Sequence, residues 1–102
     1  MSDTKKYAPV EITLYDENDE PKETYSKSVI RWGLLKKAVR LSKMITEAGT
    51  ITEEVMEALS AFVCNLFDDR FTVGDLEAGA DISEIMTCFR HVVNRANMMG
   101  NA

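Results

Sequence analysis

The sequence predicts an α+β fold that is mainly helical, with a short N-terminal β-hairpin followed by three to four amphipathic helices. Apolar and polar residues alternate from Val10 to Leu14, which is the period of a half-buried strand. Beyond residue 30, apolar residues recur every three or four positions, which is the period of a helix face. A chain of 102 residues has room for one modest core. We therefore expect one domain in residues 10–100, preceded by a loose tail in residues 1–9.

The hairpin is expected in residues 10–28. Val10, Ile12 and Leu14 share one face of the first strand, the acidic segment 16–21 forms the turn, and residues 23–28 return as the second strand. Two strands alone are only marginally stable in water. The hairpin must therefore lie on an apolar surface or pair with another sheet edge.

The first helix is expected in residues 30–48 and to end at Gly49. Its apolar stripe consists of Leu34, Ala38, Leu41, Ile45 and Ala48. At about 100° per residue, the opposite side carries a basic group formed by Lys36, Arg40 and Lys43. Trp32, Leu35 and Val39 widen the apolar arc at its edge. The helix is therefore amphipathic with a basic back.

Three further helices are expected, in residues 52–69, 73–78 and 82–99. Each has a capping signal at its start: Thr50 with Glu53, Thr72 with Asp75, and Asp81 with Glu84. The apolar residues of these helices are expected to pack as rows, which are Val55, Leu59, Phe62 and Leu66, then Met56, Val63 and Phe67, and in the last helix Ile82, Ile85, Met86, Phe89, Val92, Val93 and Ala96. Phe67, Phe71, Val73 and Leu76 are expected to pack at the joint before the last helix.

Composition excludes several classes of protein. The net charge is -5, and no apolar run approaches the roughly 18 residues that a membrane-spanning helix needs. The N-terminus lacks the apolar stretch of a secretory signal, so we expect a reducing cytoplasm. Cys64 and Cys88 are then thiols, and their apolar neighbours favour buried filler over a zinc site.

The sequence offers little for catalysis. His91 is the only histidine and lies beside an apolar stripe, with no nucleophile or orienting acid at a suitable spacing. Neighbouring carboxylates such as Asp68 and Asp69 point about 100° apart on a helix, and no glycine motif for phosphate binding is present. We therefore predict that the chain is not an enzyme and has no cofactor and no metal.

Charge is divided unevenly along the chain. Residues 31–43 carry five basic residues and no acid, whereas residues 44–84 carry ten acids against Arg70 alone. One interpretation is a small DNA-binding regulator whose basic helix 31–43 follows phosphates through Lys36, Arg40 and Lys43. The other is a self-complementary surface that produces a homo-oligomer. The acidic body and the lack of base-reading side chains count against nucleic acid.

The order of these elements resembles a known family. The short strand at residues 11–14, the lysine-rich helix around residues 34–38 and the tract Arg70-Phe71-Thr72-Val73-Gly74-Asp75-Leu76-Glu77-Ala78-Gly79 carry the resemblance. Together they look like the tail assembly chaperones of long-tailed, siphovirus-type phages and prophages of Gram-positive bacteria. Gly74 departs from the charged or polar residue more usual before the aspartate. The resemblance covers roughly residues 10–98.

The resemblance implies a chaperone in the bacterial host cytoplasm that is absent from the mature virion. It implies two partners: the tape measure protein, which such chaperones keep soluble, and the major tail tube protein, which they help to recruit. Six methionines in a short chain suit an adaptable contact surface, although Met44, Met56 and Met86 are also read as core filler. We hypothesise a protein-interaction site formed by Trp32, Leu35, Lys36, Val39, Arg40, Lys43, Met98 and Met99.

Overall fold

A computed structural model describes residues 8–100, with side chains described for residues 8–97. The elements follow in the order β1 (Val10–Tyr15), β2 (Pro21–Lys27), α1 (Trp32–Ala48), α2 (Glu53–Leu66), α3 (Val73–Gly79) and α4 (Ile82–Gly100). This order confirms the predicted fold class. The tail expected in residues 1–9 lies outside the described residues except for its last two.

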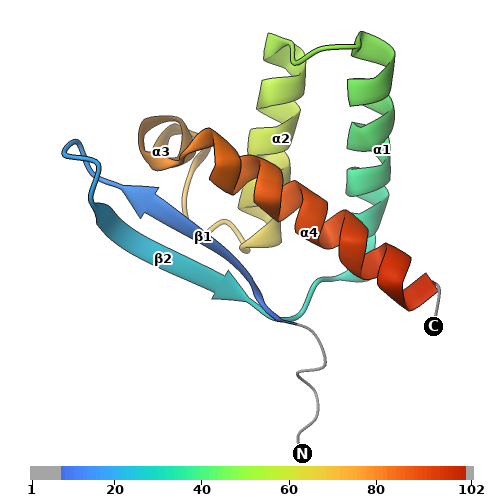
Figure 1. Cartoon of the computed structure of the whole chain (residues 1–102), viewed down its shortest axis with the longest axis horizontal. Helices are drawn as coiled ribbons and strands as arrows, with labels where there is room; N and C mark the ends of the chain where they lie inside the picture. Colours follow the sequence, from blue (N-terminus) through green and yellow to red (C-terminus); the bar gives the residue numbers. More distant parts are fainter. Residues whose placement is uncertain (1–7, 101–102) are drawn as a thin grey trace, which may run out of the picture.

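Helices α1 and α2 and the hairpin pack against α4 (Figure 1). Helices α1 and α2 run side by side in opposite directions, and α4 crosses both of them. On its other side α4 packs along β1, so that it joins the helical pair to the hairpin. Strand β2 contacts β1 and forms the outer border of the molecule.

The antiparallel hairpin has a regular register over most of its length. Val10 lies opposite Lys27, Ile12 opposite Tyr25 and Leu14 opposite Glu23, and a local irregularity follows Leu14. Because directly opposed residues share a face, these three pairs face the helices. In β1 this inward face is fully apolar and buried. The hairpin therefore lies on an apolar surface, which is one of the two arrangements that its marginal stability requires.

The predicted apolar rows form the core. The buried set includes Leu34, Ala38 and Leu41 from α1, Val55, Leu59, Phe62, Val63, Leu66 and Phe67 from the α2 segment, and Phe71, Leu76, Cys88, Phe89 and Val92 from the rest of the chain. Four predicted core positions are wrong, since Ala48, Met56, Val73 and Ile82 are exposed. Ala48 is the last residue of α1, and the other three lie in the first turn of their helices.

Helix α2 ends at Leu66, three residues before the predicted end at residue 69. Asp68 and Asp69 both adopt left-handed backbone conformations, each with φ 58°. The Asp69 N–H then donates to the carbonyl oxygen of Cys64 at 2.8 Å, which satisfies one of the free carbonyls at the helix end. Aspartate tolerates this conformation better than most residues because its short side chain bonds locally. The spacing of apolar residues in the sequence does not report this change of backbone direction.

The capping predictions have mixed outcomes. At α3 the Thr72 hydroxyl accepts from the Asp75 N–H at 3.1 Å, and the Asp75 carboxylate accepts from the Thr72 N–H at 2.9 Å, which confirms the capping box. At α2 the predicted Thr50 cap is wrong, because the Thr52 hydroxyl accepts from the Val55 N–H at 3.2 Å. The sequence does not decide which threonine caps α2, because Glu53 and Glu54 follow both of them. The capping residue depends on where the chain turns after Gly49.

The predicted capping role of Glu84 is also wrong, because its carboxylate is used between α4 and β1. Glu84 Oε1 accepts from the Thr13 N–H at 2.9 Å. Further along α4, Cys88 Sγ lies 3.7 Å from the Glu11 carbonyl oxygen, and Arg95 donates to the Ala8 carbonyl oxygen at 2.9 Å. We call this row, formed by Glu84, Cys88 and Arg95, the α4–β1 seam. It occupies the backbone groups on the side of β1 that faces away from β2.

Candidate protein-interaction surface

Helix α1 presents an outward face opposite its buried stripe. Trp32, Lys36, Val39 and Lys43 recur at steps of four, three and four residues, which places them in one row on the helix surface. All four side chains are exposed, with Trp32 83% and Val39 60% accessible. We call this row the α1 outer face.

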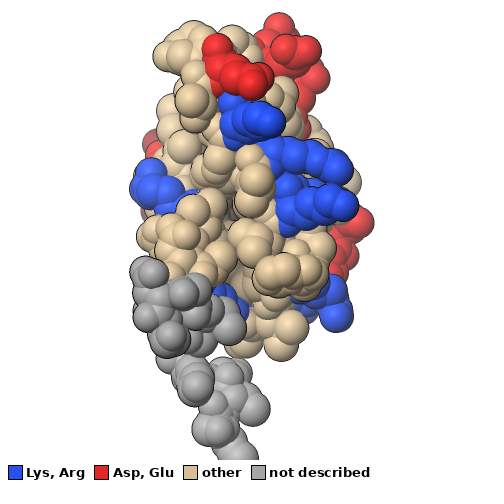
Figure 2. All heavy atoms as spheres, turned by 90° about the vertical axis from the view of Figure 1, so that its right-hand side faces the viewer, with Lys and Arg blue, Asp and Glu red and all other residues tan. Residues whose placement is uncertain are grey.

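The α1 outer face combines an exposed aromatic side chain with positive charge. Figure 2 views the molecule from the side of α1 and shows lysine and arginine side chains grouped there, next to uncharged surface and with acidic side chains at the upper end. Exposed single apolar residues are common, but an exposed indole and an exposed valine two helical turns apart in one row form a surface of the kind found at binding sites. Tryptophan and arginine are also the residues most enriched among those that dominate binding energy.

The other predicted site residues have different positions. Arg40 is exposed on the flank of the α1 outer face. Leu35 is half-buried and packs against the core, so it supports the helix from beneath that face. Met98 and Met99 belong to the last turns of α4, and their side chains lie outside the described residues. The structure therefore brings together five of the eight predicted residues on one side of α1, namely Trp32, Lys36, Val39, Arg40 and Lys43.

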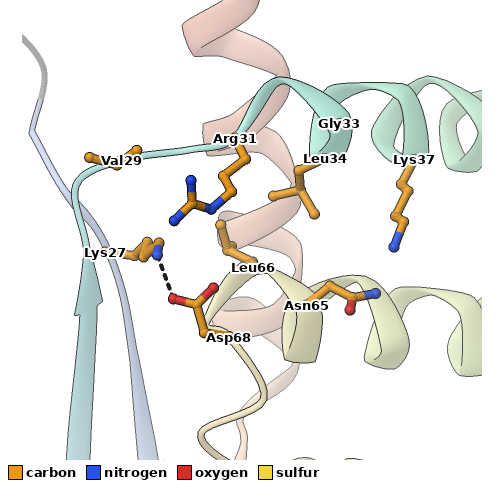
Figure 3. A pocket seen from close by; sticks show the side chains of 9 residues that line it. All are labelled: Lys27, Val29, Arg31, Gly33, Leu34, Lys37, Asn65, Leu66 and Asp68. Carbon is orange, nitrogen blue, oxygen red and sulfur yellow. Dashed lines mark hydrogen bonds and ion pairs between the residues drawn. The ribbon is translucent and has the colours of Figure 1, made fainter.

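A shallow basic pocket of about 280 Å³ lies next to the start of α1 (Figure 3). Its lining comes from the end of β2, the first turns of α1 and the end of α2, and consists of Lys27, Val29, Arg31, Gly33, Leu34, Lys37, Asn65, Leu66 and Asp68. Val29 is exposed beside it. Three basic side chains against one acid give the pocket a positive balance close to Trp32.

The acid in the pocket is neutralised locally. Lys27 Nζ lies 2.5 Å from Asp68 Oδ2, and Figure 3 shows the two side chains directed toward each other. The hydrogen bond from Lys27 holds the pKa of Asp68 below its usual value, and the charges of Lys27, Arg31 and Arg70 act in the same direction. Arg31 and Lys37 are the exposed cations that remain around the pocket.

The pocket was not predicted from the sequence. Lys27 and Asp68 are separated by 41 residues, and Asp68 points toward Lys27 only because α2 ends early. Arg31 and Lys37 were recognised as part of the basic segment, but Arg31 precedes α1, so helical spacing did not show that both side chains line one pocket. Val29, between a strand and a helix, was an apolar signal at this place.

The described thiols are poorly suited to act as nucleophiles. Burial raises the pKa of Cys88 to about 12, with the Glu84 carboxylate acting in the same direction, and burial also raises the pKa of Cys64. Both cysteines are free and buried, which confirms the prediction that they are filler thiols. Burial followed by the charge of Arg95 lowers the pKa of His91. At neutral pH these thiols are protonated and therefore weak nucleophiles.

No group of three or more possible metal ligands is found within the described part of the chain. Within the same residues, no helix is long and apolar enough to cross a membrane. What the described residues offer is exposed apolar and basic surface on a rigid helix, as in proteins that act by binding other proteins.

The chain belongs to the phage tail chaperone protein family, whose model matches residues 8–101. This match confirms the family suggested by the tract from Arg70 to Gly79, and the family is one of assembly proteins rather than enzymes. Comparisons with curated proteins and with solved structures gave no match. The chain is therefore a tail assembly chaperone by family, with protein partners in tail assembly.

Proposed function

We propose that this chaperone binds the tape measure protein through the α1 outer face and keeps it soluble in the host cytoplasm until the tail tube forms. The observation that carries the proposal is the row of Trp32, Lys36, Val39 and Lys43 on the exposed side of α1. A row at helical spacing fits a partner helix laid alongside it. The two lysines favour acidic residues at the edge of that helix.

Contact with a long helical partner explains why the outer face is exposed in the free chain. An indole and a valine are covered only when the partner is bound, and their burial supplies the main favourable term. The lysines then determine the orientation of the bound partner and the rate at which it associates. We propose in addition that the chaperone acts as a homo-oligomer, helps to recruit the major tail tube protein, and is absent from the finished virion.

Co-expression with the cognate tape measure protein tests the proposed site. We expect the Trp32→Ala, Val39→Ala double variant to lower the amount of soluble tape measure protein about 10-fold, because truncation of central apolar anchors typically costs this much or more. The matched control is Ile82→Ala, which removes an apolar side chain that is 82% exposed at the start of α4. Solubility that is unchanged by the double variant removes the α1 outer face from the site.

A second pair of substitutions distinguishes a chaperone from a DNA-binding protein. If the basic helix follows phosphates, replacement of Lys36 and Lys43 by glutamine weakens duplex DNA binding and makes it less dependent on salt. For the proposed chaperone we expect no shift of duplex DNA at physiological salt, and retained client binding that is only weakened. A DNA shift that disappears in the double glutamine variant, without any effect on the client, favours the DNA-binding alternative.

A further inference from the structure

The two edges of the β-hairpin differ in how their backbone groups are used. On the edge of β1, Thr13 donates to Glu84, Glu11 lies against Cys88, and Leu14 forms a bridge with Ala80. This edge is occupied by α4 and by the segment that precedes it. Among the residues that the structure describes, no further element covers the outer edge of β2 in this way (Figure 1).

The register shows which groups of β2 point outward. Thr13 and Glu11 direct their backbone groups away from β2, so they form the non-hydrogen-bonded pairs of the ladder. Their partners in β2 are Thr24 and Ser26, whose backbone groups therefore point away from β1. Among the described residues, no hydrogen bond to the backbone of Thr24 or Ser26 comes from outside the hairpin.

We propose that the free edge of β2 pairs with β2 of a second copy of this chain, antiparallel and centred on Tyr25. In this register Thr24 of one copy lies opposite Ser26 of the other, and both pairs exchange N–H···O=C bonds in each direction. The two hairpins become one four-stranded sheet. This proposal rests on the homo-oligomer of the proposed function and names its interface, which uses neither the α1 outer face nor a client.

Charge complementarity selects both the occupant and the register. With Tyr25 at the centre, Glu23 of each copy lies directly opposite Lys27 of the other, so that Lys27 lies between its own Asp68 and the Glu23 of the second copy. A register centred two residues closer to the turn places two Glu23 side chains opposite each other, which is destabilising. A register centred on Thr24 or on Ser26 pairs neither residue with an opposite charge. One strand is therefore complementary to itself in a single register.

Aromatic packing strengthens the centre of the pairing. Tyr25 is half-buried, and its ring stacks edge-on against Phe71, with ring centroids 4.9 Å apart. In a non-hydrogen-bonded pair the opposed side chains come close, so the two tyrosines contact each other across the axis. The Phe71 rings hold both tyrosines in position, which lowers the entropy lost on pairing.

The strand and its surroundings allow a second copy to approach. Strand β2 forms the outer border of the molecule, and the helices lie on the far side of β1 (Figure 1). Pro21 and Lys22 at the start of β2 are typical of protected edges, so they limit the pairing to the segment after them. The remaining residues match the segment that the Tyr25-centred register uses.

Sedimentation and amide exchange of the full chain test the pairing. We expect a concentration-dependent dimer in which the Thr24 and Ser26 amides become protected, while protection of the Thr13 amide does not change. Ser26→Pro removes an outward N–H and places a ring on the edge, and should weaken the dimer about 10-fold or more. The matched control Ser26→Val keeps the N–H and should dimerise as well as the wild type.

A second variant covers the case in which Ser26→Pro does not fold, as judged by circular dichroism. Glu23→Lys places lysines opposite each other at both ends of the pairing, and should weaken the dimer several-fold at low salt. A chain that stays monomeric up to about 1 mM overturns the proposal, since a pairing of this size is expected to be populated there. Self-association that neither folded variant changes also overturns it. Client solubilisation is measured with the same variants, and it distinguishes failure of the β2 pairing from failure of the proposed function.

Discussion

The α4–β1 seam and the α1 outer face both combine polar and apolar groups. In the seam these groups contact other parts of the chain, whereas on the outer face they are exposed. In the seam, Glu84 and Arg95 each bond to backbone groups of the hairpin segment. On the outer face, Trp32 and Val39 are exposed and share a row with lysines for which no ion pair is found within the described part of the chain. The first region has its partners inside the molecule. Under the proposed function, the second region finds its partner in another protein.

This difference predicts that stability and binding can be changed separately. Burial and hydrogen bonds in the seam contribute to the free energy of unfolding, because their loss leaves cavities or unpaired carbonyls. Exposed side chains contribute little to that free energy but much to binding. Substitutions in the two regions should therefore fall into two groups with little overlap.

The largest expected effect follows the loss of a buried side chain beneath α4. Ile12 has no accessible surface and lies on the inward face of β1. We expect Ile12→Ala to lower the free energy of unfolding by about 2–5 kcal/mol, because it loses buried apolar surface and leaves a cavity. Urea unfolding followed by circular dichroism measures the change.

Ile12→Val is the graded control for that experiment. It removes a single methylene and should cost about 0.5–1.5 kcal/mol. A loss below about 1 kcal/mol for Ile12→Ala contradicts the close packing of α4 on the hairpin. Comparable losses for Ile12→Ala and for a substitution on the α1 outer face contradict the contrast between the two regions.

A smaller effect is expected from the polar end of the seam. Arg95 donates to the Ser28 carbonyl oxygen at 2.7 Å and to the Ala8 carbonyl oxygen at 2.9 Å. Arg95→Met keeps most of the apolar stem but removes the donor of both hydrogen bonds, so we expect a loss of about 1–3 kcal/mol. Thermal unfolding at fixed pH and urea unfolding both report the change.

Arg95→Lys separates the charge of Arg95 from its geometry. Lysine restores a positive donor but not the planar fork that reaches two carbonyls, so it should recover only part of the loss. Full recovery by lysine shows that charge alone is needed. No loss in Arg95→Met shows that water replaces the guanidinium, and the seam then depends on packing alone.

The apolar pattern predicted most of this fold because it reports which face of each element is buried. Leu34, Ala38 and Leu41 were assigned to the core from spacing, and they are buried. The pattern fails where burial depends on the tertiary position of an element's end. Ile82 continues an apolar row, yet it lies at the first residue of α4, beyond the elements that cover the rest of the helix.

The candidate surface could be predicted only in part for a similar reason. Trp32 and Val39 were placed at the edge of the apolar arc, and the structure shows that they stand fully on the outer side. Leu35 has the same arc position by spacing but turns toward the core. The role of Glu84 depends on Thr13, 71 residues away, and no local pattern reports such a pairing.

The smallest expected effect on stability belongs to the α1 outer face, and it gives the sharpest test of the contrast. The Trp32→Ala, Val39→Ala double variant should change the free energy of unfolding by no more than about 0.5 kcal/mol per site, since little buried area is lost. Alanine also has a higher helix propensity than either residue, which offsets part of any loss. Urea unfolding of the double variant beside Ile12→Ala measures both regions under one set of conditions. A loss above about 2 kcal/mol in the double variant means that these side chains hold the fold together, and any effect on the client would then follow from unfolding. Unchanged stability with loss of soluble client assigns them to recognition.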